Sequence, residues 1–319
     1  MAETLELILA EREELTPYVT RFVLRSPTGA TLPGYSAGAH LTLTTPSGEK
    51  RSYSLVEAGE QQPTEYTVCV RREDQGRGGS LSMHRHARIG DTLTVSGPHN
   101  SFGLEPARRY LLIAGGIGVT PIRSMANELR RNEDAIVDVV YLSRSRDDTA
   151  FAEEFEQSGA VVHHSAVQGR FDLWPLLAEP DEDTRVYCCG PQPLIDDLLA
   201  LTMHWRPSRV HVEDFAGVDA LGGRQVPFQA VWEPTGEQIT VPAGRSLLHT
   251  LRDHGIRVPS SCESGTCGSC RIRLISGEAD HRDLVLTEDE RSRYMMPCVS
   301  RAAGPEVSVA PDGFEDPPH

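Results

Sequence analysis

Short hydrophobic runs separated by turn-forming residues make up the N-terminal part of the chain. Four of these runs span residues 18–24, 40–43, 66–70 and 92–95, and glycine and proline recur in the segments between them. Runs of this length predict β-strands, and several such strands joined by Gly/Pro-rich turns are typical of an antiparallel barrel. We therefore predict a β-barrel domain over residues 1–105.

The pattern changes near residue 109. Residues 110–114 form one continuous apolar run, as expected for a strand that is buried on both faces of a sheet. A glycine-rich turn follows, and Pro121 stands at a predicted first helical position. Further strands are predicted at 137–142 and 185–189, and further helices near 149–157 and 191–203. This alternation predicts a parallel, Rossmann-like α/β domain with helices on both faces, over residues 106–215.

A third patterned region follows a break in periodicity. Residues 216–226 carry glycines and show no period, which predicts a linker. Beyond the linker, residues 228–232 alternate apolar and polar side chains, and residues 246–253 have a helical pattern just before a group of cysteines. We place a third domain at residues 227–319.

Composition and charge narrow the class of protein. The chain has 319 residues, of which 39% are hydrophobic and 24% charged, enough for two or three globular domains. No apolar stretch approaches the ~20 residues that cross a bilayer. The acidic N-terminus lacks a secretory signal, so we expect a cytoplasmic protein. The formal net charge of -15 disfavours nucleic acid and anionic membranes as partners.

Cysteine spacing carries the most specific signal. Cys262, Cys267 and Cys270 form a C-x4-C-x2-C run, and Cys298 follows after a long gap, which is the plant-type ferredoxin spacing for a 2Fe–2S cluster. A zinc site is the main alternative, in which the C-terminal domain would be a zinc-stabilised interaction module. The other three cysteines are an odd remainder, which argues against a disulfide framework and for a reducing compartment.

Two segments of the predicted barrel together indicate a phosphorylated flavin. Arg51, Tyr53 and Ser54 lie along one predicted strand, where arginine can neutralise a phosphate, tyrosine can stack on a planar ring and serine can reach a ring nitrogen. Residues 76–80, Gly-Arg-Gly-Gly-Ser, lead into a predicted helix, where backbone N–H groups make a phosphate cradle. Each motif alone also fits an ordinary strand or a glycine hairpin.

Another pair of motifs follows the strands of the predicted α/β domain. Residues 115–121, Gly-Gly-Ile-Gly-Val-Thr-Pro, open a helix after the buried strand, where such folds bind a nucleotide pyrophosphate. Pro121 replaces the third glycine of G-x-G-x-x-G, so the segment is a different nucleotide loop or a tight turn. Cys189, in Cys189-Gly190-Pro191, either packs in the core or lines the place where a nicotinamide meets the flavin. No neighbouring base is evident, so we exclude covalent catalysis by this thiol.

In this order, the motifs closely resemble those of the phthalate dioxygenase reductase family, which includes the reductase components of vanillate O-demethylases. The motifs are Arg51-Ser-Tyr-Ser, Gly76-Arg-Gly-Gly-Ser, Gly115-Gly-Ile-Gly-Val-Thr-Pro, Cys189-Gly-Pro and the four-cysteine tail. The resemblance covers essentially the whole chain. It implies an FMN-binding barrel, an NADH-binding domain of ferredoxin–NADP reductase type, and a C-terminal plant-type ferredoxin with a β-grasp fold.

The resemblance also implies roles for individual residues. The flavin would contact Arg51, Tyr53, Ser54, the backbone of Cys69, Val70 and Arg71, the phosphate loop Gly78, Gly79 and Ser80, and the aromatic Phe215. The nicotinamide nucleotide would contact Gly116, Gly118, Thr120, Pro121, Ser143, Arg144, Cys189, Gly190 and Pro191. Ser54, Thr120 and Cys189 would lie at the reacting atoms, and Cys262, Cys267, Cys270 and Cys298 would hold the cluster.

Arg144 bears on the choice of nucleotide. An arginine after the second strand of the α/β domain can bind the 2′-phosphate of NADPH, but it can also stack on adenine. Because the family favours NADH, we expect NADH rather than NADPH. The tight loop at residues 76–80 resembles that of the FMN-type members, so we expect FMN rather than FAD.

The expected function is conversion of two-electron into one-electron chemistry. NADH would deliver a hydride to FMN, and single electrons would pass through the cluster to a terminal oxygenase. A Rieske-type aromatic oxygenase or demethylase is our main expectation, and a haem-thiolate monooxygenase is the alternative. The oxygenase would dock transiently beside Glu263 and Ser264, and the reductase would be a monomer.

Overall fold

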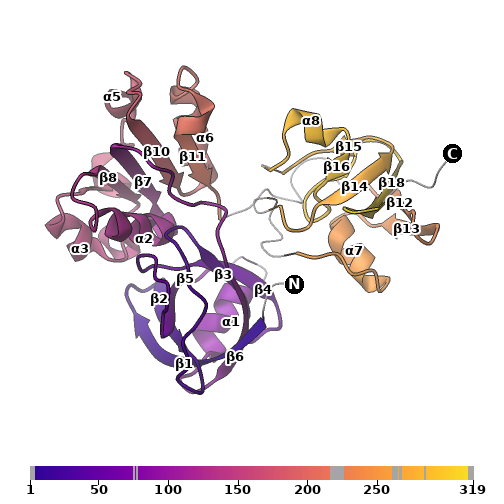
Figure 1. The fold of residues 1–319 in the computed structure, drawn as a ribbon, viewed down its shortest axis with the longest axis horizontal. Coiled ribbons are helices and arrows are strands. Elements are labelled where there is room, and N and C mark those ends of the chain that lie inside the picture. The colour runs from indigo at the N-terminus through magenta and orange to yellow at the C-terminus, as the bar shows by residue number, and fades with distance from the viewer. Residues whose placement is uncertain are drawn as a thin grey trace. The chain divides into compact units, whose positions relative to one another are not determined.

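The structure is a computed structural model that describes residues 4–74, 76, 78–215, 226–260, 265, 268–283 and 285–314. Two units form the chain, Met1–Phe215 and Ala216–His319 (Figure 1). The first unit holds a β-barrel and an α/β domain, and the second holds a smaller domain of strands and helices. Within these ranges, no helix combines the length and the apolar character that crossing a bilayer requires.

The barrel is built from six antiparallel strands and one helix. These elements are β1 (Thr4–Glu14), β2 (Val19–Arg25), β3 (His40–Thr44), β4 (Lys50–Ser54), β5 (Glu65–Arg71), α1 (Gly79–His86) and β6 (Thr92–His99). The strand order is β4-β3-β6-β1-β2-β5, and a bridge between Leu55 and Val68 joins the two outer strands. Met83 of α1 is fully buried in the barrel core, so the helix covers the barrel interior. The predicted antiparallel barrel is confirmed.

The α/β domain alternates strands and helices as predicted. Its elements are β7 (Arg109–Gly115), η1 (Gly116–Gly118), α2 (Val119–Leu129), β8 (Ile136–Ser143), η2 (Arg146–Asp148), α3 (Ala152–Gln157), β9 (Val161–His164), α4 (Ser165–Gln168), α5 (Trp174–Leu177), β10 (Thr184–Cys189), α6 (Gln192–Leu201), η3 (Pro207–Arg209) and β11 (Val210–Glu213). All neighbouring strands pair in parallel, in the order β11-β10-β7-β8-β9.

Helices cover both faces of this sheet because both faces are apolar. Neighbouring residues of one strand belong to different cores: Cys189 packs with the side chains of α2 and α3, and Cys188 packs with those of α5 and α6. Both cysteines are fully buried. This two-sided burial explains the continuous apolar runs in the sequence.

One boundary differs from the prediction. The helix after the glycine-rich turn begins at Val119, so Pro121 lies inside its first turn and not at its first position. The first N–H groups of a helix have no acceptor within the helix, so a proline there removes no hydrogen bond. Proline therefore marks the first turn of this helix without fixing its first residue.

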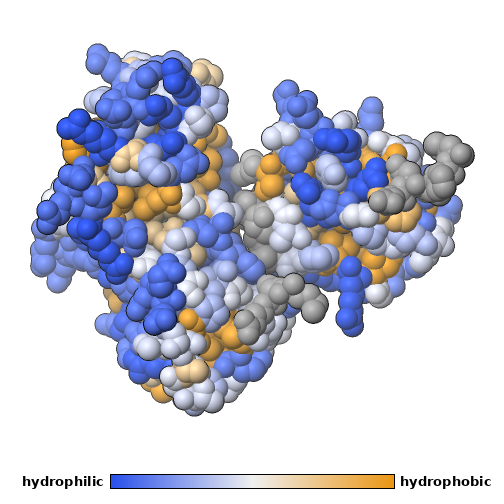
Figure 2. All heavy atoms as spheres, viewed as in Figure 1, coloured by the Kyte–Doolittle hydropathy of each residue, from blue (hydrophilic) through white to orange (hydrophobic). Residues whose placement is uncertain are grey.

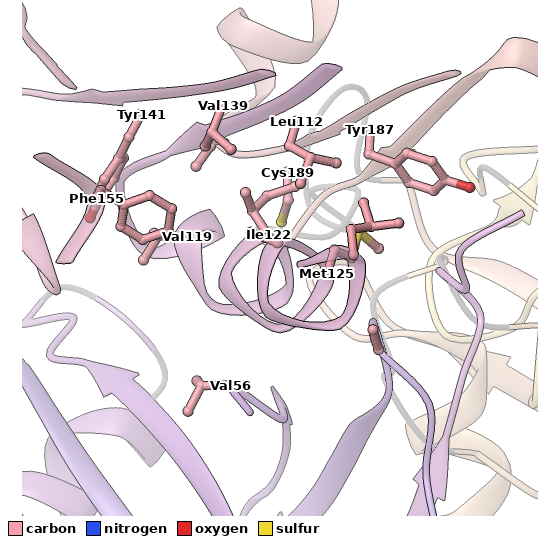
Figure 3. Packing of buried hydrophobic residues seen from close by; sticks show 14 of the residues in the cluster. Val56, Leu112, Val119, Ile122, Met125, Val139, Tyr141, Phe155, Tyr187 and Cys189 are labelled. Carbon is pink, nitrogen blue, oxygen red and sulfur yellow. The ribbon is translucent and has the colours of Figure 1, made fainter. Parts of the chain in front are cut away.

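One hydrophobic core is shared by the barrel and the α/β sheet. Val56 and Cys69 come from the barrel, and they belong to the same buried cluster as Ile122 and Met125 of α2. Figure 3 shows Val56 on the opposite side of α2 from the sheet residue Leu112. Because apolar surface buried between two elements stabilises them at roughly 25 cal/mol per Å2, this core holds the barrel and the sheet together.

The second unit is a mixed sheet with a helix packed on it. Its elements are β12 (Phe228–Trp232), β13 (Glu237–Val241), α7 (Leu247–Asp253), β14 (Ile272–Ser276), β15 (Ala279–Asp280), α8 (Glu288–Arg291), β16 (Tyr294–Met295), β17 (Arg301–Ala302) and β18 (Glu306–Pro311). The main sheet has the order β13-β12-β18-β14-β16. Ser246 caps α7 by accepting the His249 N–H at 3.2 Å, and Leu247, Leu248 and Leu251 enter the core.

Hydrophilic side chains cover much of the visible face of each unit, and hydrophobic residues lie between them (Figure 2). The polar exterior and the buried apolar clusters are those of a protein that folds around its own cores.

Replacing Phe155 by alanine tests the shared core. The ring is 1% exposed and meets Tyr141 edge-on at 5.4 Å between ring centroids. Because the substitution leaves a cavity, we expect the free energy of unfolding of the first unit to fall by about 3–5 kcal/mol, measured by urea denaturation. Val167→Ala, at a side chain that is 86% exposed, is the control and should change stability by less than about 0.5 kcal/mol. Equal effects at the two positions would contradict this account of the core.

Candidate cofactor sites

The two segments that predict a flavin phosphate site lie against each other. Arg51, on β4, has a side chain that is 20% exposed and an Nη2 atom 3.1 Å from the Glu49 carboxylate. A Cβ atom placed on Gly79 would stand 3.0 Å from Cγ and 3.1 Å from Nε of Arg51, so the glycine allows a close approach. Gly78 precedes α1 with a φ of +90°, a conformation that favours glycine. A guanidinium beside the first N–H groups of a helix is suited to bind a phosphate.

Two buried hydroxyl groups further along β4 lack partners. Tyr53 Oη and Ser54 Oγ are inaccessible to solvent, and neither has a hydrogen-bond partner among the described residues. Burial raises the pKa of the Tyr53 phenol to about 12, so it stays protonated. Buried hydroxyls are nearly always hydrogen-bonded in folded proteins. The pair therefore fits a site in which a bound polar ring, such as a flavin, supplies the missing partners.

The other residues predicted to contact a flavin occupy different environments. Cys69 is buried in the core shared with the α/β domain, and burial raises the pKa of its thiol to about 12. Val70 points into the barrel core, while Arg71 is exposed with its Nη1 3.6 Å from the Glu73 carboxylate. Ser80 Oγ accepts the Glu73 N–H at 3.1 Å. These contacts anchor the loop between β5 and α1.

Phe215 is the last residue described before the segment 216–225. It is 40% exposed, and it follows β11, the last strand of the α/β domain in the chain. An aromatic ring that remains this exposed has a surface on which a planar ligand can stack.

The two predicted nucleotide-binding motifs meet through their backbones. A Cβ atom on Gly118 would stand 2.1 Å from the Cys189 carbonyl oxygen, and one on Gly190 would stand 2.9 Å from Gly115 Cα. Neither position therefore accepts a larger residue without moving the backbone. Thr120 is 2% exposed, and its hydroxyl donates to the Ile117 carbonyl at 3.0 Å, which fixes the start of α2.

The glycine loop also has an open side. Gly116 has a φ of +56°, and a Cβ atom there would meet nothing within 4 Å. Pro191 lies at the start of α6, and Pro121 lies in the first turn of α2. The carboxyl ends of β7 and β10 thus present two helix starts at the sheet edge where such folds bind nucleotides.

Glu213 is a neighbour of Cys189 that the sequence analysis missed. The Cys189 thiol lies 3.9 Å from the Glu213 carboxylate, since β10 and β11 pair in parallel with these two residues in register. Burial, and after it the negative charge of Glu213, raise the pKa of the Cys189 thiol well above its ordinary value. A thiol held in its neutral form is a poor nucleophile. The acidic pair Glu213-Asp214 before Phe215 was the signal available in the sequence, because Glu213 is the last residue of β11, which pairs with β10.

The adenosine end of the predicted nucleotide site is already hydrogen-bonded. Ser143 Oγ lies 2.9 Å from His164 Nδ1 and 2.7 Å from Thr149 Oγ1. The Arg144 side chain is exposed, and its carbonyl accepts the Ala166 N–H at 2.9 Å. Ser143 therefore orders the loop after β8, whereas the Arg144 side chain is accessible to a ligand.

Two of the four predicted cluster ligands are described, and they lie together. Cys270 Sγ and Cys298 Sγ are 3.2 Å apart, and both residues are buried with 3% exposure. Cys262 and Cys267 lie outside the described residues, as do Glu263 and Ser264. Two soft sulfur donors converging in a buried place fit an iron–sulfur cluster, and they would equally fit zinc.

Asp283 is a second residue that the sequence analysis missed. Its buried carboxylate accepts the Leu286 N–H at 2.8 Å and the Ser300 hydroxyl at 3.3 Å. Ser300 follows Cys298 closely, and a Cβ atom on Gly265 would stand 3.4 Å from Asp283 Cα. The carboxylate thus braces the segment that lies between the cysteine loop and the last cysteine. Asp283 is one of six acidic residues between Cys270 and Cys298, so the sequence alone did not distinguish it.

Known proteins resemble the chain over nearly its whole length. It is 44% identical over 298 residues to the phthalate 4,5-dioxygenase oxygenase reductase subunit of Pseudomonas putida, covering 91% of this chain and 92% of that protein. It is 41% identical over 310 residues to the phthalate dioxygenase reductase of Burkholderia cepacia, covering 95% and 96%. A solved structure of phthalate dioxygenase reductase, described as a modular structure for electron transfer from pyridine nucleotides to [2Fe-2S], superposes with a TM-score of 0.80 at 41% identity over 96% of this chain and 98% of that chain.

A larger protein contains a similar structure. The chain superposes on an intact type IV self-sufficient cytochrome P450 monooxygenase with a TM-score of 0.77 and 34% identity. The match covers 96% of this chain and 41% of the P450 chain. A region similar to nearly all of this chain therefore also occurs within one polypeptide that carries a P450.

Gly118→Ala tests the backbone contact between the two nucleotide motifs. Because the added methyl group meets a carbonyl oxygen that cannot move freely, we expect the free energy of unfolding of the first unit to fall by about 1–3 kcal/mol. Chemical denaturation measures the change. Gly103→Ala is the control, since a Cβ atom there would be at an ordinary distance of 3.5 Å from its nearest neighbour. If both variants are as stable as the parent protein, the two loops do not touch as described.

Three family models match successive parts of the chain. The oxidoreductase FAD-binding domain matches residues 6–103, the oxidoreductase NAD-binding domain residues 112–183, and the 2Fe-2S iron-sulfur cluster binding domain residues 230–303. The protein is thus an oxidoreductase with flavin-binding, NAD-binding and 2Fe–2S modules. With its close relatives and its matching structure, the chain belongs to the phthalate dioxygenase reductase family.

Proposed function

We propose that this protein is the NADH-dependent reductase component of a multicomponent oxygenase, with FMN as its flavin. The observation that carries the proposal is the shared core of the first unit. Cys69, beside the candidate flavin strand, and Cys189, beside the candidate nicotinamide loop, belong to the same buried cluster. Electron transfer from nucleotide to flavin requires that the two sites be adjacent.

The flavin site is assigned to one strand and one loop. Arg51 and the backbone at Gly78, Gly79 and Ser80 would hold the phosphate, and the unpartnered hydroxyls of Tyr53 and Ser54 would hydrogen-bond to the ring system. The tight loop at residues 76–80, which resembles that of the FMN-type members of the family, supports FMN over FAD. Phe215 supplies an exposed aromatic surface for stacking.

The nucleotide site is assigned to the carboxyl ends of β7, β8 and β10. Gly116, Gly118, Thr120 and Pro121 would approach the pyrophosphate, and Cys189, Gly190 and Pro191 would shape the nicotinamide pocket. The neutral Cys189 thiol would provide an apolar contact and no charge. Ser143 orders the loop that carries Arg144, whose accessible guanidinium would stack on the adenine of NADH.

A bound flavin accepts electrons in pairs and a 2Fe–2S cluster carries them singly, which is the chemistry that these groups supply. The protein contributes orientation and burial. Thr120 and Cys189 are 2% and 0% exposed, so this side of the proposed nicotinamide pocket would be shielded from water. Cys262, Cys267, Cys270 and Cys298 would hold the cluster, and the surface around the cysteine loop would receive the oxygenase in a transient contact.

The partner we favour is a Rieske-type aromatic oxygenase or demethylase. The relatives named for phthalate dioxygenase systems support a ring-oxidising partner. A haem protein is the second candidate, because one relative, 37% identical, is the beta subunit of a heme-dependent oxidative N-demethylase of Ectopseudomonas mendocina, and another belongs to a P450. Turnover with each type of purified oxygenase, with this protein as the only reductase, separates the two.

Anaerobic titration with NADH tests the proposal itself. Protein purified without oxygen should contain flavin and show iron–sulfur absorption, and NADH should bleach the flavin and then reduce the cluster. NADPH should act more slowly than NADH at equal concentration. A protein that contains zinc and shows no iron–sulfur absorption would instead support the interaction-module alternative.

Cys298→Ser separates the two halves of the electron path. Loss of this thiolate should release iron and abolish reduction of a one-electron protein acceptor, while NADH still bleaches the flavin. Cys188→Ala is the matched control, because this cysteine lies in the core of the first unit and should leave iron content and electron transfer unchanged. If Cys298→Ser still reduces the protein acceptor, the proposed electron path through the cluster is wrong.

Arg51→Ala tests the flavin phosphate site. Removing a charged hydrogen-bond partner costs about 1.5–3 kcal/mol, so we expect FMN to bind at least about tenfold more weakly. The flavin content of purified protein and an FMN titration of the apoprotein measure this. Arg21→Ala, which removes an arginine paired with Glu11 and Glu13 on the barrel surface, should retain normal flavin content. Unchanged FMN affinity in Arg51→Ala would refute the assignment.

A further inference from the structure

Arg123, which is not assigned to either cofactor, makes polar contacts with two distant segments of the first unit. It lies on α2, one turn after the helix start that carries Thr120, and its side chain is only 13% exposed. Its Nη1 atom donates to the Val56 carbonyl at 2.9 Å and lies 2.9 Å from the Glu57 carboxylate. Val56 and Glu57 follow closely after Ser54, the end of the candidate flavin strand. Arg123 thus connects the nucleotide helix directly to the continuation of the flavin strand.

The same guanidinium also contacts α3 and the residue before it. Arg123 Nε donates to the Glu154 carboxylate of α3 at 2.9 Å, and the guanidinium lies 4.7 Å from the centroid of the Phe151 ring. Phe151 has a φ of +59°, a conformation that costs a non-glycine residue on the order of 1–3 kcal/mol. The stacking and the ion pair help to hold this conformation, which sets the direction of α3 after the loop at residues 143–148.

Two further residues, Ser124 of α2 and Arg131 just after its end, strengthen the connection. The Ser124 hydroxyl donates to the Glu57 carbonyl at 2.5 Å, and Ser124 is fully buried. Arg131 donates to the Gly59 carbonyl at 2.8 Å, but its side chain is 62% exposed. The segment from Val56 to Gly59 is therefore fastened to α2 at several points, of which Arg123 alone also reaches α3 within the described structure.

We propose that Arg123 is a positioning residue that sets the approach of the nicotinamide to the flavin. This inference rests on the proposed function. The guanidinium fixes three segments relative to one another: the end of the flavin strand, the helix that begins at the glycine loop, and the helix after the adenosine loop. The hydrogen bonds and ion pairs that the described structure gives the Arg123 side chain go to Val56, Glu57 and Glu154, none of which is assigned to a cofactor, so we expect it to act through backbone placement.

Replacing Arg123 tests the inference by separating rate from affinity. In Arg123→Met we expect the saturating rate of flavin reduction by NADH to fall by about ten- to a hundredfold, because small misplacements of reacting groups have effects of this size. The dissociation constant for NADH should change by less than about threefold, and FMN content should not change. NADH deuterated at the transferred position should show an isotope effect at least as large as in the parent protein, since hydride transfer becomes slower.

Three further variants complete the experiment. Arg123→Lys keeps the charge but not the planar fork, so it should recover only part of the rate. Glu57→Gln removes one partner at a half-exposed position, where folding is not at risk, and should slow flavin reduction by several-fold. Arg130→Met is the control, because this exposed arginine at the end of α2 donates to Asn127 of the same helix at 2.7 Å, and its rate should stay within about twofold of the parent rate.

The outcomes distinguish this inference from the function on which it rests. Parent-like reduction rates in both Arg123→Met and Glu57→Gln would overturn the positioning role. So would a slow rate that is fully explained by lost FMN or weakened NADH binding, because that pattern indicates only general structural damage. A parent protein whose flavin is not reduced by NADH would refute the proposed function itself.

Discussion

The structure of the first unit depends on one hydrophobic contact, the packing of α2 between the barrel and the parallel sheet. Ile122 and Met125 of this helix share a buried cluster with Val56 and Cys69 of the barrel. The same helix begins at the glycine loop, so the element that joins the two domains also carries one of the candidate binding motifs. Packed interiors resist deformation, and the distance between the two candidate sites therefore depends on side-chain volumes in this core as well as on polar contacts such as those of Arg123.

Backbone approach is the second constraint on the candidate sites. Gly118 admits the Cys189 carbonyl, and Gly79 admits the Arg51 side chain, in both cases because no Cβ atom is present. These contacts explain why glycines gather at these loops although the two belong to different folds. Because these loops are rich in glycine, only a few side chains are available to bind a ligand. Among them, the buried hydroxyls of Tyr53 and Ser54 have no hydrogen-bond partner in the described structure.

The sequence predicted the architecture well because each domain has its own periodicity. Short hydrophobic runs separated by turn-forming residues indicated the barrel, and continuous apolar runs indicated a sheet that is covered on both faces. The structure shows this double cover at Cys188 and Cys189, which belong to different buried clusters. The prediction for Pro121 was wrong, since proline is tolerated throughout the first helical turn. Local pattern identifies the element more reliably than its first residue.

Contacts between distant segments were beyond the sequence analysis. Glu213 is aligned with Cys189 only through the parallel pairing of β10 and β11, and Asp283 meets Ser300 only after the chain has returned on itself. Arg123 is similar, because its partners Val56 and Glu154 lie in different domains on either side of it in the chain. A single charged residue within an amphipathic helix has no periodicity of its own, so its partners become visible only in three dimensions.

The adjacent cysteines of β10 have a consequence for chemical probing of the fold. Cys188 and Cys189 are both fully buried, but they face opposite layers of helices. A thiol reagent can reach either one only after the layer above it opens, and the two layers belong to separate buried clusters. The alkylation rates of the two cysteines, measured separately, would therefore report how often each face of the sheet opens. The two probes are consecutive residues of one strand.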